Sequence, residues 1–338
     1  MRLWIAGSAV PRPAAGRVAY VDGRADGVFR EGVDVELSHR FGNRTPRQFR
    51  GDTATAICLR FVESGGKADL AVNDHVDVDG VLALFTLLEP ELALGHRRTL
   101  LQAAEMGDFF GWGEQAAQEL YQGLALLIAQ ARGDPGAIAN RALERATALL
   151  VSGPRPELAA GLRALQRAAR LVDRGDVRRR TWGARFAHYE IPFALSSPAA
   201  MRVPSLGEPF SEACVLWPQV RSRLDRERIV LVTVGVKGGW AHELWYPGYC
   251  WADAPQSWRP PGVEEDGSFR HAGLSAALLR LQAVEMGEGT WQCADRLALG
   301  EGLPGRGFPV AAAFIKDGAL VASTIKPDQV AQILSGAF

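Results

Sequence analysis

The sequence lacks an excess of charge of either sign. Lysine plus arginine and aspartate plus glutamate both number 38 among 338 residues, so the formal net charge is zero. Proteins that track long nucleic acid usually carry a basic excess or a basic face. One basic run, residues 170–185, stands out, and either a basic face or the solvated end of a helix explains it. We therefore expect no long nucleic acid among the partners of this protein.

Long apolar runs and paired cysteines are also missing from the sequence. No stretch approaches the roughly 20 apolar residues that a membrane helix needs. The short apolar run at the N-terminus meets Pro11 and Pro13 at once, unlike a signal peptide. The four cysteines lie far apart and form no C-x-x-C pair, as expected for reduced thiols. These absences predict a cytoplasmic protein without a membrane partner.

Two common catalytic motifs are absent as well. The sequence contains no G-x-x-x-x-G-K-[ST] loop and no G-x-S-x-G elbow, which argues against a P-loop NTPase and an α/β-hydrolase. The overall composition, 47% hydrophobic and 22% charged, is ordinary for a globular protein.

The residue pattern predicts an α/β fold in two domains. The first third alternates strands with one helix that begins after Asp52, the middle is helical, and β-branched and aromatic residues dominate from about residue 184. We predict a mainly parallel sheet with flanking helices in residues 1–180 and a smaller α+β domain in residues 181–338. The predicted strands are Val18–Val21, Val33–Leu37, Leu70–Val72, Phe186–Leu195, Ala213–Trp217, Ile229–Val236, His242–Tyr246, Ala311–Ile315 and Leu320–Thr324. The predicted helices are Thr53–Glu63, Val81–Leu88, Thr99–Met106, Glu114–Ala131, Ala137–Leu150, Glu157–Leu171, Leu274–Glu285 and Asp328–Leu334.

An acidic motif follows the strand predicted over Leu70–Val72. In strand geometry the side chains of His75, Asp77 and Asp79 share one face. Two carboxylates beside an imidazole repel each other unless a cation lies between them, and this donor set suits Mn²⁺, Mg²⁺, Fe²⁺ or Zn²⁺ better than soft metals. A polar loop whose acids cap the following helix is the alternative, and it explains Asp79 most easily.

The segment His75-Val76-Asp77-Val78-Asp79-Gly80 resembles the first motif, H-x-D-x-D-G, of the DHH phosphoesterase superfamily. The resemblance implies a DHH-like first domain in which His75, Asp77 and Asp79 hold Mn²⁺ or Mg²⁺, with Asp77 and Asp79 in catalytic roles. It also implies that Asp108 completes the metal site from the end of a second strand or turn. The resemblance covers at most about a third of the chain. The signature Asp-His-His triplet and the Gly-Gly-Gly-His type of motif are both absent from the sequence.

A second segment, Ser38–Pro46, has the pattern S-H-x-x-G-N-x-T-P. The chain is similar here to an uncharacterised bacterial family, which supplies no function. Two arginines, a histidine and two hydroxyls in nine residues could cradle an anion, with His39 or Arg44 against a substrate phosphate. A loop closed by an asparagine turn explains the same residues equally well.

Further candidate residues lie in the second domain. A Gly-Gly turn places Lys237 and His242 where they could contact an anion, and a plain β-hairpin turn is the alternative. His188 and Glu190 share one face of a predicted strand, so they could ligate a metal or simply face solvent. A tryptophan-rich segment, residues 240–258, could stack a base or pack a proline-rich loop.

These features together predict a metal-dependent phosphoesterase-like hydrolase acting on a small phosphorylated compound or nucleotide. The alternatives are a binding or regulatory protein that keeps the fold, and a metal-dependent biosynthetic enzyme of another reaction class. We expect Lys237 or His242 to face residues 75–79 across a cleft between the two domains. The sequence leaves open whether the protein forms a homodimer.

Overall fold

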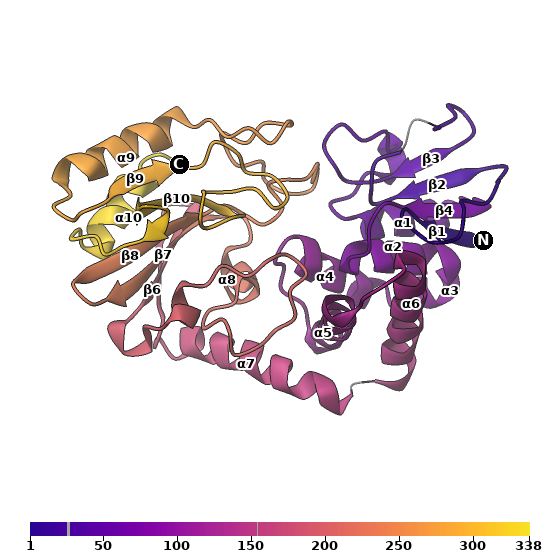
Figure 1. Cartoon of the computed structure of the whole chain (residues 1–338), viewed down its shortest axis with the longest axis horizontal. Coiled ribbons are helices and arrows are strands. Elements are labelled where there is room, and N and C mark those ends of the chain that lie inside the picture. The colour runs from indigo at the N-terminus through magenta and orange to yellow at the C-terminus, as the bar shows by residue number, and fades with distance from the viewer. Residues whose placement is uncertain (26–27, 154) are drawn as a thin grey trace. The chain divides into compact units, whose positions relative to one another are not determined.

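The computed structural model describes residues 1–25, 28–153 and 155–338. The chain forms two compact units of nearly equal length (Figure 1). The first unit comprises residues 1–162 and two short returns of the chain, 206–209 and 252–257, and the second comprises the rest. The boundary therefore lies in helix α7 (Ala159–Asp173), earlier than the predicted residue 180, and the second unit is not clearly the smaller one.

The sheet of the first unit is wholly parallel, as predicted. Its strands lie in the order β1-β4-β2-β3. Three of them fall where the pattern predicts, while β1 occupies the N-terminal apolar run that we did not identify as a strand. The strands are β1 (Arg2–Ile5), β2 (Val18–Val21), β3 (Val35–Leu37) and β4 (Leu70–Asn73).

Helices cover one face of this sheet. The main core joins alternate residues of all four strands to helices α1, α2 and α6, whereas the other face packs partly buried residues of the loops, such as Ala15 and Phe29. This alternation follows from the two-residue period of a strand. The helices are α1 (Ala54–Glu63), α2 (Val78–Leu88), α3 (Pro90–Gly95), α4 (Arg97–Asp108), α5 (Gln115–Gln130) and α6 (Pro135–Ser152), with short 3₁₀ turns at Arg47–Phe49 and Pro156–Leu158.

The N-cap of α1 is Thr53 and not Asp52 as predicted. The Thr53 side chain accepts a hydrogen bond from the backbone N–H of Ala56, three residues into the helix. Asp52 instead binds the 252–257 segment, since its carboxylate accepts hydrogen bonds from Gln256 N and Ser257 Oγ.

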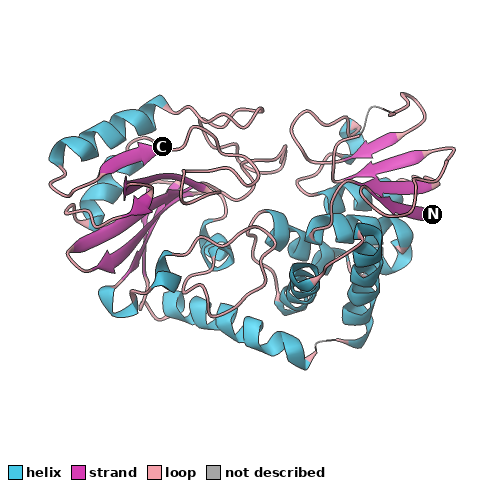
Figure 2. Ribbon diagram, viewed as in Figure 1, coloured by secondary structure: helices cyan, strands magenta, loops and turns pink. Residues whose placement is uncertain are grey.

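The second unit contains a mixed sheet of seven strands. The order is β11-β10-β8-β7-β6-β5, β9 pairs with β10, and only β6 and β7 run parallel among the paired strands. Figure 2 shows helices packed against this sheet. The strands are β5 (Arg178–Trp182), β6 (Phe186–Ile191), β7 (Ile229–Val236), β8 (Gly239–Trp245), β9 (Thr290–Cys293), β10 (Val310–Lys316) and β11 (Ala319–Leu320), and the helices are α8 (Pro218–Asp225), α9 (Ala272–Val284) and α10 (Pro327–Ser335), with 3₁₀ turns at Phe193–Leu195 and Pro198–Met201.

Three strand predictions in this unit are wrong in part. The strand predicted over Leu320–Thr324 is only the two-residue strand Ala319–Leu320. Residues 213–217 form no strand and lead into α8, because a short apolar run is ambiguous without its partners and Pro218 starts a helix there. The strand from Phe186 ends at Ile191, since Pro192 cannot continue the hydrogen-bond ladder. The turn 316–318 does form the predicted hairpin between β10 and β11.

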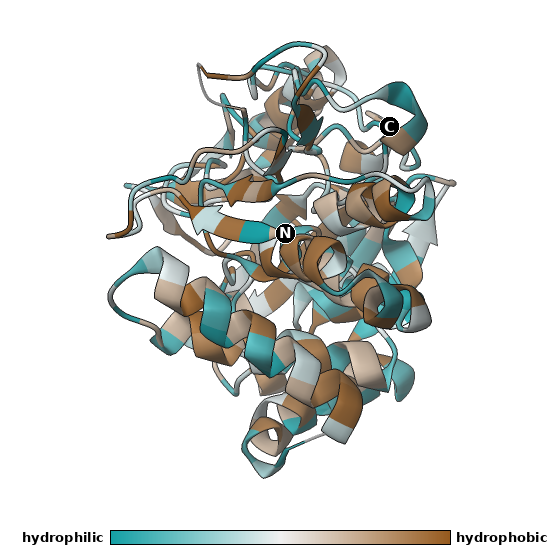
Figure 3. Cartoon of the chain, turned by 90° about the vertical axis from the view of Figure 1, so that its right-hand side faces the viewer, coloured by the Kyte–Doolittle hydropathy of each residue, from teal (hydrophilic) through white to brown (hydrophobic). Residues whose placement is uncertain are grey.

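Brown and teal residues alternate along the helices that lie nearest the viewer in Figure 3. Such banding is expected of amphipathic helices that pack one face on a core. Among the residues that the structure describes, no helix is long and apolar enough to cross a membrane.

Candidate metal centre

Three neighbouring strands of the first unit end in polar residues. Asp22 directly follows β2, His39 lies two residues after β3, and the acidic motif follows β4. Because the sheet is parallel, these strand ends lie at one edge, where α/β folds gather their functional groups. Helix α4 ends at the same place and brings Asp108 to it.

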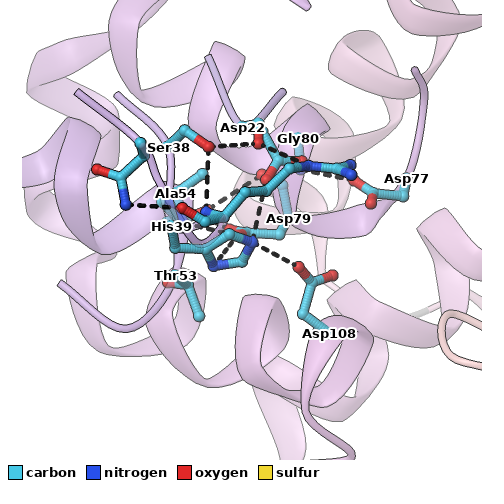
Figure 4. A network of polar contacts seen from close by, with 12 residues as sticks. Asp22, Ser38, His39, Thr53, Ala54, Asp77, Asp79, Gly80 and Asp108 are labelled. Carbon is cyan, nitrogen blue, oxygen red and sulfur yellow. Dashed lines mark hydrogen bonds and ion pairs between the residues drawn. The ribbon is translucent and has the colours of Figure 1, made fainter. Parts of the chain in front are cut away.

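Four buried side chains form what we call the inner group: Asp22, His39, Asp79 and Asp108. The Nε2 atom of His39 lies 3.3 Å from Asp22 Oδ1 and 3.3 Å from Asp108 Oδ2. One potential ligand atom from each residue lies within 4.8 Å of all the others. Figure 4 shows the side chains converging from separate elements. Asp108 therefore faces the motif as predicted, although from the end of a helix and not from a strand.

The ring of His39 is oriented by a backbone group. Its Nδ1 atom lies 2.8 Å from the carbonyl oxygen of Asp52, which can only accept, so we assign the proton to Nδ1. In the neutral ring the lone pair of Nε2 then points at two carboxylates. This is the arrangement that metal-ligating histidines show, with the outer nitrogen held by an acceptor.

A second, half-exposed set of side chains, the outer group, comprises Asp22, His75 and Asp77. The Nε2 atom of His75 lies 2.9 Å from Asp77 Oδ2 and 3.1 Å from Asp22 Oδ2. Its Nδ1 atom lies 2.5 Å from Asp74 Oδ1, so this ring too has its outer nitrogen held by an acceptor. The side chains of His75 and Asp77 are 28% and 34% exposed, so the outer group is open to solvent while the inner one is not.

Asp22 belongs to both groups. Its Oδ1 faces His39 and its Oδ2 faces His75, so one carboxylate joins the two sets of donors. Burial by itself would raise the pKa of Asp22, but the hydrogen bonds and charges of His39 and His75 hold that pKa well below its usual value. The backbone of Asp22 is left-handed, with φ of 64°, a conformation that non-glycine residues adopt rarely and often at functional sites.

The other inner carboxylates are crowded. Burial, followed by the charge of Asp22, raises the pKa of Asp79 to about 7. Burial and the charges of the neighbouring aspartates raise the pKa of Asp108 well above its usual value. Three buried carboxylates beside one imidazole cannot all be ionised without a further positive charge, as the raised pKa values of Asp79 and Asp108 show. A divalent cation fits this donor set, because it supplies that charge and is coordinated by these atom types.

Asp79 also serves the fold. Its two oxygens accept hydrogen bonds from the backbone N–H groups of Ala54 and Thr55, at 2.7 and 2.9 Å, at the start of α1. The carboxylate therefore caps α1 and not α2, the helix to which Asp79 itself belongs. Asp77 caps α2, accepting from Gly80 N at 2.8 Å. Capping of the following helix is thus observed for Asp77, whereas Asp79 caps the preceding helix, and capping leaves His39, His75 and Asp108 unexplained.

Gly80 provides space for the centre. A Cβ atom at this position would collide with the Asn73 side-chain amide and lie 2.9 Å from Asp22 Oδ2 and Asp77 Oδ1. The Nδ2 atom of Asn73 is buried and makes no hydrogen bond with any described residue, while its Oδ1 accepts from Asp74 N. Side chains from β2, β4 and α2 therefore meet around one glycine.

Both late returns of the chain support the centre. In the 252–257 segment, Asp253 N donates to His39 O at 2.7 Å, and Ser257 Oγ donates to Asp52 at 2.6 Å. In the 206–209 segment, Gly207 N donates to Gly107 O at 3.0 Å, next to Asp108. Residues distant in sequence thus fix the backbone around two of the inner ligands.

Comparison with known proteins identifies a family. Residues 10–204, more than half of the chain, match the family described as "Family of unknown function (DUF6687)". The chain belongs to the DUF6687 family. The residues of the inner and outer groups all lie within the DUF6687 match, whereas Lys237 and His242 lie beyond it. No curated protein and no solved structure matches the chain.

The predicted anion contacts have different surroundings in this DUF6687 protein. His39 is a member of the inner group and not an exposed anion contact. Arg44 is exposed, lies 3.4 Å from Glu31 and stacks over Phe29, and the Ser38–Pro46 segment is closed by the expected asparagine turn at Asn43.

Lys237 and His242 belong to the second unit. Lys237 is exposed in a two-residue hairpin turn between β7 and β8, the plainer of the two alternatives. His242 is fully buried and hydrogen-bonded to Thr233 Oγ1 and to the carbonyl of Ile325, so its ring is not exposed as expected of a substrate contact.

The remaining candidates of the second unit have structural partners. His188 lies 3.1 Å from Thr233 Oγ1, and Glu190 pairs with Arg178, so neither joins a metal-like cluster among the described residues. The tryptophan-rich segment contributes several buried aromatic side chains, namely Trp245, Tyr246, Tyr249 and Trp251. Three arginines of the basic run form ion pairs: Arg178 with Glu190, Arg179 with Asp225 and Arg180 with Asp328.

Asp22 lies outside every motif from which candidate metal ligands were predicted. The available signal was a polar residue directly after a buried strand, which both Asp22 and the Ser38-His39 pair provide. That signal becomes specific only when the strand order is known, because β2 lies between β3 and β4.

Proposed function

We propose that this protein is a divalent-metal-dependent hydrolase of phosphoesterase type, acting on a small phosphorylated compound or nucleotide. The observation that carries the proposal is the pair of imidazole–carboxylate groups joined through Asp22. Two cations bridged by shared ligands are a common device of enzymes that hydrolyse phosphate esters. The resemblance of residues 75–80 to the DHH phosphoesterase motif supports the same reaction class.

The donor atoms favour Mn²⁺ or Mg²⁺. Asp22, His39, Asp79 and Asp108 would hold one ion, and Asp22, His75 and Asp77 a second. Carboxylate oxygens dominate both sets, and Cys58, the nearby thiol, is fully buried with its pKa raised well above the usual value by burial, so a thiophilic metal is disfavoured. A divalent cation held there supplies Lewis-acid chemistry, polarising a phosphoryl oxygen and favouring a nucleophile derived from water at neutral pH.

Different residues of the chain would fix the metal ligands, admit the substrate and contact its phosphate. The buried inner group excludes water and fixes its ligands through α1 and the Asp52 carbonyl. The half-exposed outer group is the side from which a phosphate can enter. Arg40 lies beside it, since its Nε donates to Asp22 O at 3.3 Å and its charge helps to lower the pKa of Asp74 after the hydrogen bond from His75. We propose Arg40 as the anion contact nearest the centre. Zero net charge fits a small substrate in the cytoplasm better than long nucleic acid.

The test combines metal analysis with a screen of phosphate esters. We expect the purified protein to bind Mn²⁺ and to hydrolyse bis(p-nitrophenyl) phosphate or at least one phosphorylated metabolite. Asp77→Asn removes an anionic ligand and should abolish turnover, whereas Asp317→Asn in an exposed turn should leave it unchanged. Metal binding without turnover on any ester would favour the non-catalytic binding protein. No Mn²⁺ uptake in calorimetry at millimolar concentration would refute the metal centre itself.

A further inference from the structure

A buried arginine of the second unit has no counter-charge in contact. Arg221 lies in α8 and is 4% exposed. Its guanidinium carbon lies 3.8 Å from the ring centroid of Trp245. Within the described part of the chain, the guanidinium makes no ion pair and no hydrogen bond. None of its nitrogens is among the fully enclosed side-chain atoms that lack a partner, so the edge of the guanidinium reaches solvent, where an anion can approach its N–H donors.

The indole N–H group of Trp245, the ring on which Arg221 stacks, also lacks a hydrogen-bond acceptor among the described residues. Trp245 is 4% exposed, and its Nε1 atom makes no hydrogen bond with any residue that the structure describes. A buried indole N–H usually finds an acceptor. Two adjacent side chains from different elements, α8 and β8, therefore present N–H groups for which the described chain offers no acceptor.

The charges around Arg221 leave it uncompensated. Glu243, two residues before Trp245 and on the same face of β8, is bound by the guanidinium of Arg306, which also donates to Met201 O. Two arginines and one glutamate thus give this buried cluster a net positive charge. Burial lowers the pKa of Arg221 to about 10, so the group stays charged at neutral pH.

The acid on the same helix is already engaged. Asp225 accepts hydrogen bonds from Arg179, Arg228 and the hydroxyl of Tyr189. It therefore has no role in balancing Arg221.

We propose that Arg221 and Trp245 bind an oxyanion, the phosphate or carboxylate group of a small ligand. The N–H donors of a guanidinium match the spacing of the oxygens in such groups. The face of the guanidinium can stay stacked on the indole ring while its edge donates hydrogen bonds to the anion. Because the guanidinium lies directly over the ring, one oxyanion can contact both side chains. The bound anion would neutralise the cluster and supply the missing acceptor. This site uses no residue of the candidate metal centre and does not rest on the proposed hydrolase function.

The experiment is thermal unfolding of the full chain in phosphate, acetate and chloride at equal ionic strength. An oxyanion at ten times its Kd should raise Tm by roughly 2–4 °C over chloride. Arg221→Met should remove this rise, and Trp245→Phe, which keeps the ring face but loses the N–H, should reduce it. Arg296→Met, at an exposed ion pair, and Asp77→Asn, at the metal centre, should both retain it. A larger response to phosphate than to acetate would identify a phosphorylated ligand, and the reverse a carboxylic one.

The inference is overturned if wild-type Tm is the same in all three salts, or if Arg221→Met responds as the wild type does. In chloride, Arg221→Met should be at least as stable as the wild type, because it removes a charge that is costly to bury. If that variant does not fold, Arg221→Lys takes its place, since it keeps the charge and loses the fork. A weakened oxyanion response then supports the site, and an unchanged response refutes it.

Discussion

Asp22 is the residue on which the two groups of the centre depend. It reaches them because β2 ends directly before it and its backbone turns left-handed, so that its two oxygens face different histidines. Each of the other ligands serves a single group. The centre is therefore asymmetric. The carboxylate of Asp22 belongs to both groups, and a substitution of any other candidate ligand changes only one group.

This asymmetry predicts different metal contents for matched variants. Asp22→Asn keeps the shape of the side chain but removes the shared charge, so it should lose metal from both groups. Asp108→Asn should affect the inner group and Asp77→Asn the outer one. Elemental analysis after dialysis against Mn²⁺ measures the bound metal per chain. A wild-type metal content in Asp22→Asn would contradict the bridging role.

Gly80→Ala tests the crowding around the centre. The added methyl would meet the Asn73 amide, Asp22 and Asp77, none of which can retreat without losing its own contacts. We expect a loss of about 1–3 kcal/mol in the free energy of unfolding, as in overpacked cores, and weaker metal binding. Gly95→Ala is the matched control, because a Cβ there meets nothing within 4 Å. Urea unfolding compares the two, and equal stabilities would show that the site tolerates the methyl group.

At the scale of elements, the centre is assembled by the ends of strands and helices together with two late returns of the chain. The start of α1 receives Asp79, and the end of α4 delivers Asp108. The 252–257 segment then fixes the loop that carries His39 and the Asp52 that orients its ring. Folding of the first unit is consequently coupled to residues from the second half of the sequence.

Ser257→Ala measures that coupling. The substitution removes the hydrogen bond to the Asp52 carboxylate, which should cost about 0.5–1.5 kcal/mol of stability and weaken metal binding although no ligand changes. Ser275→Ala removes a serine hydrogen bond on the exposed side of α9 and serves as the control. Urea unfolding and Mn²⁺ calorimetry report the two effects. If both variants bind Mn²⁺ like the wild type, the late segment does not position His39.

At the scale of the whole molecule, the two units contain different clusters of buried polar side chains. The first concentrates carboxylates, while the second buries two histidines joined through Thr233. Burial lowers the pKa of His188 to about 4 and that of His242 to about 3. Both rings are therefore neutral in the folded protein near neutral pH.

The histidine pair predicts acid sensitivity. The unfolded chain binds protons at a histidine pKa of about 6.5, before the folded protein does, so the stability is complete above pH 6.5 and is lost as the pH falls toward 4. Each histidine should contribute on the order of 1–2 kcal/mol of this loss by pH 5. His188→Gln does not titrate and should shrink the difference between urea unfolding at pH 7 and pH 5. An unchanged difference would show that His188 is protonated in the fold.

The sequence by itself determined most elements and four of the six residues of the candidate centre. Hydrophobic periodicity located nearly every helix, and the alternation of His75, Asp77 and Asp79 indicated a cation site, because spacing along one segment fixes which side chains share a face. Asp108 was also found, though on the wrong kind of element. These features depend only on residues that are close in sequence, so the order of the residues is enough to predict them.

Tertiary structure alone decided the other two residues. Asp22 and His39 join the centre because β2 lies between β3 and β4, an order that no local pattern encodes. The burial of His242 is decided in the same way, since only the pairing of β7 with β8 and the carbonyl of Ile325 place its ring in the core of the second unit. The boundary near residue 162 and the two late returns likewise depend on contacts between distant segments. Strand order and burial depend on contacts between distant parts of the chain. The candidate ligands Asp22 and His39 can therefore be recognised only in the folded structure.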